Sequence, residues 1–407
     1  MIAALAWRNI WRQPIRTALS MVGMGFAAML LVFMLSFEFG SYDTIKTGML
    51  RISDGFGQIQ PKGYKDDPAI DKVIEEPTAL MADLAGVGAV TASSARDMAF
   101  VLLARGNLSF AAAVTGIDPV QENRITVVSS YVKQGRALRA GDRDAIILGD
   151  GLARNLGVKL GDRITLLGSA RDGSVAADVL RLVGIFKSNI PEMDRQVAQI
   201  PLARFNETFQ MNGAVNTVAL SGRTLRDITA ASGRLRRIAA RHGLVYLDWA
   251  QLQPAIKQGI ALDLSTAMTM YATLIFVVVF IILNTLYMSV LERTREFGVL
   301  LAIGMKPRQI GRMVWMEIIF LSLVGTGIGV VLGMILTGWF QVHGISFQGL
   351  QEVYAQFGLP SRIYPHMTPF RVLFGPLVML AAVVLLAVIP YRRVLGLKPV
   401  SAMGAGG

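Results

Sequence analysis

Four long stretches without a charged residue limit the folds open to this chain more than any other feature. They are Thr17–Phe37, Leu264–Leu291, Ile318–Phe340 and Val372–Ile389. Because an α-helix rises about 1.5 Å per residue, about 20 apolar residues cross the roughly 30 Å hydrocarbon core of a bilayer. Each stretch is close to that length or longer, so the sequence predicts four transmembrane helices.

The composition agrees with a membrane protein and leaves room for one water-facing domain. Of the 407 residues, 53% are hydrophobic and 17% are charged, and the mean hydropathy is +0.49. Ordinary soluble domains carry about 25% charged residues. The segment between the first two stretches is long enough to bury a core of its own. We therefore predict an α-helical membrane protein with four transmembrane helices and an α+β domain inserted between helices 1 and 2.

Basic residues predict the orientation of these helices. They cluster before the first stretch, between the second and third, and after the fourth: Arg8, Arg12 and Arg16; Arg293, Arg295, Lys306, Arg308 and Arg312; Arg392, Arg393 and Lys398. The positive-inside rule places all three clusters in the cytoplasm. Topology thus accounts for the net charge of +12, and we expect no nucleic-acid partner.

The resulting order of segments begins with an amphipathic elbow helix over residues 1–16, on the cytoplasmic side. The transmembrane helices follow at 17–40, 263–291, 313–340 and 370–390. The outer α+β domain covers 41–262, a cytoplasmic helix or loop 292–312, an outer loop 341–369 and a cytoplasmic tail 391–407. An alternative for the elbow is an extension of the first helix that Pro14 kinks. We expect no cleavage after the first stretch, because no small-residue cleavage pattern follows it.

The outer domain alternates short apolar runs with helical patterns. Strands are predicted at Ala145–Gly149, Asp162–Leu167, Val179–Phe186, Val197–Ile200, Val215–Leu220 and Leu244–Leu247. Helices are predicted at Asp150–Leu156, Leu202–Phe209 and Leu225–Arg241. This mixture predicts an α+β fold of one or two subdomains.

Motifs for catalysis or metal binding are missing from the sequence. It contains no phosphate-binding Gly-x-x-x-x-Gly-Lys-Ser/Thr loop, no His-Glu-x-x-His and no Gly-x-Ser-x-Gly. It has no cysteine, and its three histidines, His242, His343 and His366, are isolated from one another. We expect no catalytic residue, no metal site and no cofactor on this chain.

Polar and small residues inside the apolar stretches predict helix packing. Gly325, Gly329 and Gly333 recur every fourth residue and form a strip that a neighbouring helix can approach closely. The alternative is that glycine is simply common in membrane helices. Asn284 is an amide in the middle of the second stretch, so we expect it to face protein and to hydrogen-bond across helices.

Several segments resemble the permeases of ABC transporters of the MacB and FtsX type. The most specific is residues 284–310, NTLYMSVLERTREFGVLLAIGMKPRQI. LAWRNIWRQP at 5–14, GIDPVQE at 116–122 and LGDGLARNLGVKLGD at 148–162 add to it. With four predicted helices and no ATPase motif, the chain looks most like the lipoprotein-releasing LolC and LolE branch.

The resemblance implies a place in the bacterial inner membrane, with the outer domain in the periplasm, and a set of partners. These are a LolD-like ATPase that works as a dimer and carries ATP and Mg, a second permease chain that is the same or a paralogue, and a periplasmic lipoprotein carrier or adaptor. Such permeases extract substrate from the outer leaflet by mechanotransmission. Two rival functions remain open, MacB-like export of peptides or drugs and FtsX-like signalling to a cell-wall hydrolase.

The same resemblance assigns roles to individual residues. ATPase coupling falls on the loop after the second helix, with charged Arg293, Arg295 and Glu296 exposed and Phe297, Val299 and Leu300 as apolar anchors that insert into a cleft. The alternative is a solvated turn whose charges only hold the topology. The coupling residues are Glu292, Arg293, Arg295, Glu296, Phe297, Gly298, Leu300 and Met305. A substrate cavity between helices 1 and 2 of two chains would be lined by adaptable side chains. The candidates are Met24, Phe33, Phe37, Met268 and Tyr271.

Overall fold

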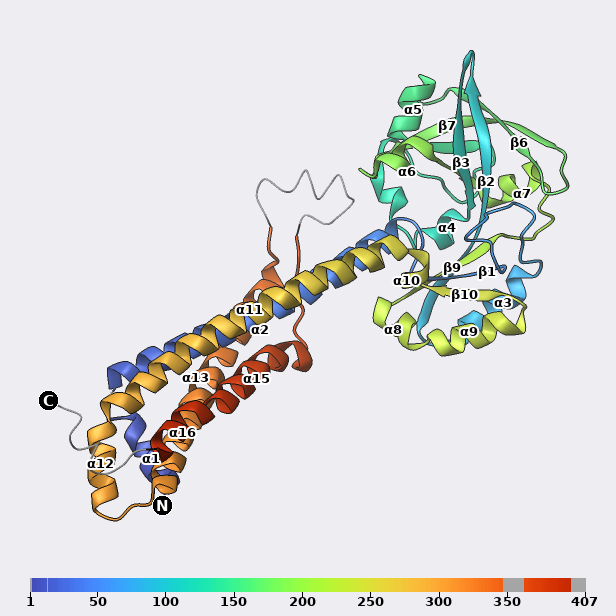
Figure 1. Ribbon diagram of the computed structural model, residues 1–407. Coiled ribbons are helices and arrows are strands. Elements are labelled where there is room, and N and C mark those ends of the chain that lie inside the picture. The colour runs from blue at the N-terminus through green and yellow to red at the C-terminus, as the bar shows by residue number, and fades with distance from the viewer. Residues whose placement is uncertain (1, 13, 347–361, 397–407) are drawn as a thin grey trace. The chain divides into compact units, whose positions relative to one another are not determined.

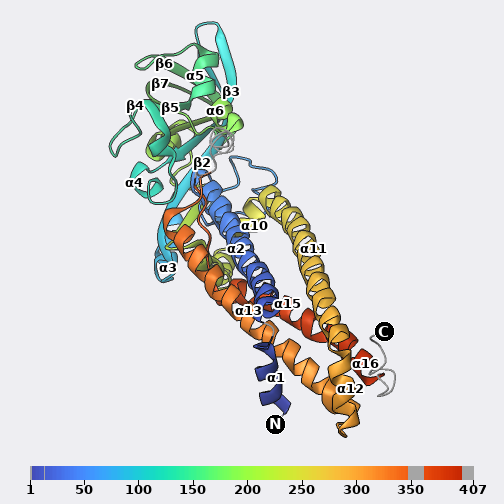
Figure 2. The ribbon, with the colours of Figure 1, turned by 90° about the vertical axis from the view of Figure 1, so that its left-hand side faces the viewer.

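The computed structural model describes residues 2–12, 14–346 and 362–396. The chain divides into two compact units (Figures 1 and 2). The first, called the helical unit here, comprises residues 1–43, 260–346 and 362–407. The second, called the sheet unit, comprises residues 44–259 among those described. The sheet unit is thus inserted after the first long helix, which confirms the predicted insertion.

The helical unit contains the four predicted membrane spans. Its helices are α1 (Ile2–Ile10), α2 (Pro14–Ile52), α11 (Pro254–Glu292), α12 (Thr294–Ala302), α13 (Pro307–His343), α15 (Pro369–Leu386) and α16 (Val388–Leu395), of which α2 and α11 continue into the sheet unit. Within the described residues, four segments are long and apolar enough to cross a membrane: Thr17–Ile52, Pro254–Glu292, Pro307–His343 and Pro369–Leu395. The apolar stretches therefore identified all four.

Two of these helices are much longer than the apolar stretches from which they were predicted. Each of α2 and α11 has 39 residues, a length of about 58 Å at the usual rise per residue. The apolar stretch in α2 ends where Glu38 begins the charged part, but charged side chains do not stop a helix. Hydropathy identifies only the segment that can lie in the hydrocarbon core, whereas the hydrogen-bonded helix continues beyond that segment.

The fourth span is interrupted. Helix α15 ends at Leu386 and α16 begins at Val388. Pro390 lies within α16 and has no N–H to donate to the carbonyl four residues earlier, which falls at Leu386. The break in the helix therefore follows from the proline.

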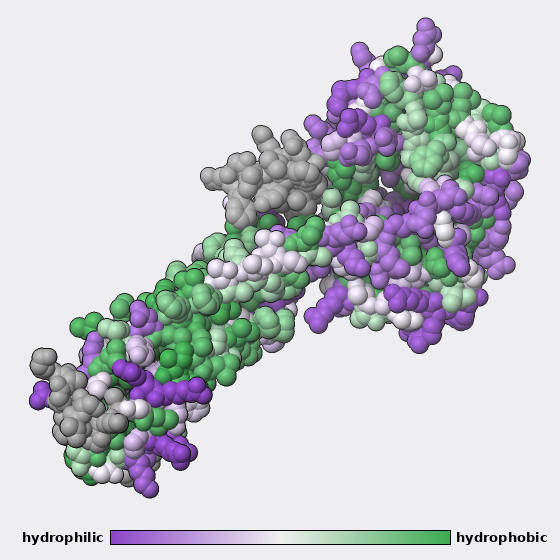
Figure 3. Space-filling view, viewed as in Figure 1, coloured by the Kyte–Doolittle hydropathy of each residue, from purple (hydrophilic) through white to green (hydrophobic). Residues whose placement is uncertain are grey.

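Helix α13 lies at the centre of the helical unit. It contacts α1, α15 and α16, and its glycines lie against α2. In contrast, only 22% of the apolar window of α11 is buried. The surface of the helices is mainly hydrophobic, whereas the surface of the sheet unit is mainly hydrophilic (Figure 3). This contrast is the one expected of a helical unit in lipid and a sheet unit in water.

The sheet unit is built on one sheet of ten strands. They are β1 (Gly57–Gln60), β2 (Val90–Arg105), β3 (Leu108–Ile117), β4 (Val132–Gly135), β5 (Ala145–Gly149), β6 (Arg163–Ser169), β7 (Val175–Phe186), β8 (Val197–Pro201), β9 (Thr217–Gly222) and β10 (Val245–Asp248). The connecting helices are α3 (Pro77–Ala85), α4 (Pro119–Glu122), η1 (Val128–Tyr131), α5 (Asp150–Leu156), α6 (Pro191–Gln196), α7 (Leu202–Thr208), α8 (Leu225–Ala230), α9 (Ser232–Arg241) and α10 (Trp249–Leu252). The predicted strands and helices are present within a few residues of their expected bounds, except that the predicted helix Leu225–Arg241 is divided at Ala231 into α8 and α9.

Part of this sheet closes on itself. The strand order is β10-β1-β9-β2-β3-β8-β5-β7-β4, and β6 pairs with both β2 and β7. The strands β2, β3, β8, β5, β7 and β6 therefore form a ring. Its inward side chains include Val101, Leu103, Leu166 and Leu180, which belong to one buried cluster. A second core lies around β1, β9, α3 and α9 and includes Ile59, Leu80, Val218 and Leu235.

The segment 116–122 links the end of α2 to the sheet. Asp118 caps α4 by accepting a hydrogen bond from the Val120 N–H at 2.8 Å. At the other end of α4, Glu122 pairs with Arg96 at 2.7 Å, and both side chains are over nine-tenths buried. Arg96 also donates to the Ser53 carbonyl at 2.5 Å. A buried, bidentate ion pair thus anchors the residues that follow α2 to strand β2.

Candidate functional site

The residues after α11 form a compact helical hairpin. Helix α12 begins one residue after α11 ends, with Arg293 between them at φ −89° and ψ 8°. At its other end Gly304 has a φ of +103°. The Gly304 N–H donates to the Leu301 carbonyl at 3.1 Å and the Met305 N–H to the Leu300 carbonyl at 3.0 Å. This pair of bonds is a Schellman motif, which turns the chain back into α13.

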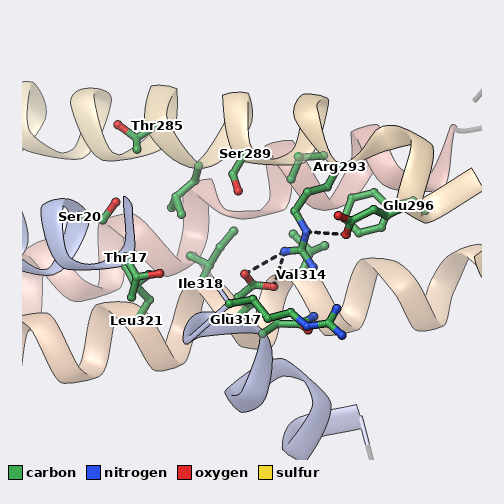
Figure 4. Close-up of a pocket in the computed structure, with 15 residues that line it drawn as sticks. Thr17, Ser20, Thr285, Ser289, Arg293, Glu296, Val314, Glu317, Ile318 and Leu321 are labelled. Atoms are coloured by element: carbon green, nitrogen blue, oxygen red, sulfur yellow. Dashed lines mark hydrogen bonds and ion pairs between the residues drawn. The ribbon is translucent and has the colours of Figure 1, made fainter. Parts of the chain in front are cut away.

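Arg293 fastens this hairpin to α13 (Figure 4). Its Nη1 donates to both carboxylate oxygens of Glu317, at 3.0 and 3.1 Å. Its Nε donates to Glu296 at 3.4 Å, and its guanidinium lies 5.3 Å from the centre of the Phe297 ring. The Arg293 and Glu317 side chains are only 12% and 18% exposed. The start of α12 is therefore tied to α13 by a largely buried ion pair.

A small polar cavity of about 70 Å³ lies beside this ion pair. Figure 4 shows Thr17 and Ser20 of α2, Ser289 of α11 and Glu317 of α13 around it. The Thr17 hydroxyl donates to the Ile10 carbonyl at 2.7 Å, which joins α1 to α2. The cavity can hold a few water molecules. Helices α1, α2, α11 and α13 thus meet at this polar cavity.

Helix α12 has a buried face and an exposed face. Phe297 is 1% exposed and packs in the core of the helical unit, and Leu300 and Met305 are half-buried against the same core. Val299 and Ile303 are 46% and 78% exposed. The exposed residues at helical spacing, called the α12 outer face here, are Arg295, Glu296, Val299 and Ile303.

This arrangement corrects two expectations. Arg293 was expected to be exposed, but it is paired with Glu317 inside the bundle. Phe297 was expected to be available as an apolar anchor, but its ring fills the core beneath α12. The other coupling residues lie as follows: Glu292, Arg295 and Glu296 are exposed and Gly298 is buried. The family resemblance implied a helix here but did not show which of its faces α13 covers.

The structure adds residues that the sequence did not single out. Glu317 is one, and its signal was an acidic residue directly before an apolar stretch. At the other end of the helices, the Tyr42 hydroxyl of α2 contacts two carboxylates, Glu38 and, at 3.0 Å, Asp263 of α11. Nearby, Arg371 pairs with Asp43 at 3.0 Å. Ionisable residues thus mark both ends of the helical unit.

The glycine strip lies between α13 and α2. A Cβ atom built on Gly329 would stand 2.2 Å from the Gly25 carbonyl oxygen, and one on Gly333 would stand 2.8 Å from Val32 Cβ. A Cβ on Gly325 would stand 3.2 Å from Met24 Cβ. The two helices are in backbone contact here, which a side chain on any of the three glycines would disturb.

Asn284 differs from its expected environment. Its side chain is exposed on α11, and its amide makes no hydrogen bond within the described part of the chain. The reason is that few helices cover α11 in a single chain. Within this chain, therefore, Asn284 does not bond across helices.

The candidate substrate residues are not equally accessible. Met24 is fully buried, and Tyr271 is 4% exposed. Phe33 is half-buried, with its ring 6.1 Å from that of Phe37 and 5.7 Å from that of Phe340. Phe37 and Met268 are half-buried as well. In a single chain, Phe33, Phe37 and Met268 retain surface for another molecule, whereas Met24 has none.

Two family models match this chain. The model described as MacB-like periplasmic core domain matches residues 17–238, more than half of the chain. The model described as FtsX-like permease C-terminal matches residues 268–399. The chain belongs to the MacB and FtsX family of ABC transporter permeases. The family accounts for both units: the first match takes in most of the sheet unit, and the second covers α12, α13 and the fourth span.

Three relatives illustrate the range of this family. The lipoprotein-releasing system transmembrane protein LolC of Neisseria meningitidis is 25% identical over 55% of this chain and 55% of its own length. An uncharacterized ABC transporter permease of Methanocaldococcus jannaschii is 22% identical over 82% of this chain and 83% of its own. A macrolide export ATP-binding/permease protein MacB of Yersinia pestis is 25% identical over 82% of this chain and 50% of its own. The matches with LolC and MacB thus span only about half the length of those relatives.

Proposed function

We propose that this permease, driven by a separate ATPase, extracts lipoproteins or another lipid-like substrate from the outer leaflet of the inner membrane. The substrate would pass to a periplasmic acceptor. Two features support this proposal. Relatives named for lipoprotein release match the chain, and its apolar helices are joined to a domain of the MacB periplasmic type.

The observation that carries the mechanism is the length of α2 and α11. At about 58 Å, each of these 39-residue helices is nearly twice the thickness of the hydrocarbon core. Both run without a break from the helical unit into the residues of the sheet unit. A stiff helix of this kind transmits a displacement along its axis, so movement at α12 reaches the sheet unit through α11. Transport by mechanotransmission then needs no pore.

We place α12 and both termini in the cytoplasm and the sheet unit in the periplasm. Arg295, Lys306 and Arg308 lie in or near the α12 turn and are exposed, which agrees with the positive-inside rule. The α12 outer face is then the surface that an ATPase dimer with bound ATP and Mg would contact. Val299 and Ile303 would enter its cleft, and Arg295 and Glu296 would pair with charges at the rim.

Docking at the α12 outer face is tested by Val299→Asp. A carboxylate in an apolar contact loses the burial of a valine and adds an unpaired charge. We expect the variant to copurify with at least about tenfold less ATPase than the wild type, since about 1.4 kcal/mol corresponds to a factor of ten. The matched control is Val179→Asp, because Val179 is similarly exposed, at 50%, but lies on β7 of the sheet unit.

Equal ATPase recovery with both variants would contradict docking at α12.

Substrate class is tested separately, in a strain depleted of the permease. Lipoproteins retained in the inner membrane support the proposal, whereas drug hypersensitivity with normal lipoprotein sorting supports MacB-like export. Export remains the second candidate because the match to MacB covers 82% of this chain and the match to LolC covers 55%.

A further inference from the structure

One face of the sheet carries a row of polar side chains across five adjacent strands. Thr217 of β9 pairs with Arg96 of β2, and Gln60 of β1 lies level with Thr217, because the preceding Ile59 pairs with Val218. Two residues along β2 from Arg96, Met98 pairs with Thr115 of β3, and Thr115 pairs with Gln199 of β8. Directly paired residues, and residues two apart, point to the same face. The opposite face carries the apolar cores described above.

A cavity of about 570 Å³ lies over this row. This volume is within the range of about 300–1,000 Å³ found for ligand pockets. The row crosses four strand spacings of about 4.8 Å each, roughly 19 Å in total. The cavity, called the sheet-face cavity here, is lined by residues of the sheet unit alone.

Several polar side chains that line the sheet-face cavity have no hydrogen-bond partner among the described residues. Gln60, Gln199, Tyr64 and Thr217 are only 3%, 7%, 5% and 7% exposed. Their side chains make no hydrogen bond within the described residues, yet all four line the cavity. Their polar atoms are not among the buried atoms that lack a partner, so they face the open cavity, where water can bond to them. A ligand with matching donors and acceptors can replace that water.

The remaining lining combines adaptable apolar groups with charged groups, most of which are bonded within the chain. Met49, Met98 and Met193 come from the end of α2, from β2 and from α6. Methionine side chains adapt to ligand side chains of different shapes. The charges of Arg96 and Glu122 are paired with each other. Lys65 donates to the Leu252 carbonyl at 2.9 Å, and the carboxylates of Asp54 and Asp97 accept hydrogen bonds from Ser53 and Asn216. Glu192 also lines the cavity and is exposed. The lining groups that remain open to a ligand are therefore mainly uncharged donors and acceptors.

We propose that the sheet-face cavity binds an extended, uncharged peptide segment. Glutamine amides match peptide groups because each supplies a donor and an acceptor. Peptide groups recur about every 3.4 Å along an extended chain, so a short segment can satisfy Gln60, Thr217 and Gln199 in turn. A carbohydrate is less suited, because Tyr64 is the one aromatic residue of the lining on which a sugar ring could stack.

Binding at this cavity would act on the chain where it enters and leaves the sheet unit. Met49, Ile52 and Ser53, at the end of α2, form one wall. Leu252 and Gln253, directly before α11, form another. A peptide between these walls would stabilise one arrangement of the two segments. This inference holds whichever substrate the transporter moves.

Cysteine protection tests the site on the full-length chain in detergent, because the natural sequence contains no cysteine. The probe is a pool of acetylated and amidated tetrapeptides of Ala, Ser, Gly and Leu. Thr217→Cys should react with a small water-soluble thiol reagent, and the peptide pool should slow this reaction. Ser174→Cys, at an exposed turn, should react at the same rate with and without peptide. Absence of labelling at Thr217→Cys, absence of protection, or protection by a neutral oligosaccharide alone would overturn the proposal.

The double substitution Gln60→Leu with Gln199→Leu separates ligand binding from folding. In the Thr217→Cys background, it should raise the peptide concentration needed for half-protection about tenfold or more, because two hydrogen bonds are lost. The same change should leave the melting temperature unchanged or higher, since both amides lack partners in the free chain. The control Gln134→Leu, at an exposed position on β4, should change neither quantity. A lower melting temperature with unchanged protection would assign the two glutamines to the fold and refute the site.

Discussion

Asp97 is a buried carboxylate that joins distant parts of the sheet unit. It is 1% exposed. Its oxygens accept hydrogen bonds from the Asn216 N–H at 2.9 Å and from the Asn206 side chain at 3.4 Å. The Asn216 side chain in turn donates to the carbonyls of Ile70 and Lys72, at 3.2 and 3.0 Å. Burial raises the pKa of Asp97 to about 7, although the bond from Asn216 acts in the opposite direction.

This pKa predicts a pH dependence of stability. Between the ordinary pKa of 3.8 and the folded-state pKa of about 7, the folded chain holds a proton that the unfolded chain has released. The free energy of unfolding therefore falls as the pH rises through this range, and the contribution of Asp97 is fully present only below it. We expect the melting temperature to drop by a few degrees more between pH 5 and pH 8 in the wild type than in Asp97→Asn. Equal drops in thermal unfolding of the two purified chains would contradict this assignment.

At α12, single residues also show the limit of sequence reasoning. The family resemblance implied a coupling helix or loop within residues 292–312, and the structure has α12 at Thr294–Ala302. The resemblance could not show that Phe297 faces inward and Val299 outward. That choice depends on where α13 passes, and Arg293 fixes it through Glu317, 24 residues away along the chain.

At the scale of the helices, α2 and α13 are packed with their backbones in direct contact. Gly25 and Gly329 face each other, so that a Cβ on Gly329 would stand 2.2 Å from the Gly25 oxygen and 2.7 Å from Ala28 Cβ. Neither backbone nor Cβ atoms can rotate away, unlike the end of a long side chain. The helices would have to separate to admit a methyl group.

Gly329→Ala tests this contact between α2 and α13. We expect the change to destabilise the helical unit by about 1–3 kcal/mol, as overpacking of a tight contact does, and to lower the melting temperature in detergent. Gly327→Ala on the same helix is the matched control, because its Cβ would meet nothing within 4 Å. Alanine favours a helix over glycine, so the control should be at least as stable as the wild type. If Gly329→Ala and Gly327→Ala had the same melting temperature, the helices would not be in contact at Gly329.

The elements of the fold were predictable where the signal is local. Apolar length identified the four spans, and short apolar runs identified strands such as Ala145–Gly149. In contrast, no strand was predicted over Val90–Ile117, where β2 and β3 form the longest pairing of the sheet. Ser93, Arg96 and Asp97 interrupt the apolar alternation of β2 there, because that strand borders a polar cavity. The closure of β6 onto β2 depends on contacts between distant residues, which no local pattern records.

At the scale of the whole molecule, one side of α11 is exposed in the single chain. Phe276, Phe280 and Ile281 are 71%, 64% and 59% exposed, as suits contact with lipid. The side chain of Asn284 is exposed as well. An amide in hydrocarbon normally bonds to another helix. The described part of this chain supplies no such bond, so we expect a second permease chain to supply it.

A cysteine cross-link tests whether that second chain is another copy. In native membranes, Asn284→Cys should form a disulfide-linked species of twice the mass of the chain when an oxidant is added. It should do so because residues near the axis of a symmetric pair approach their own copies. Ile335→Cys is the control, since Ile335 is 65% exposed on α13 and should remain a monomer. Both proteins carry one cysteine, because the natural sequence has none. Absence of the cross-link at Asn284→Cys, with a cross-link to a coexpressed paralogue instead, would make the pair a heterodimer and leave α11 as the surface that selects the paralogue.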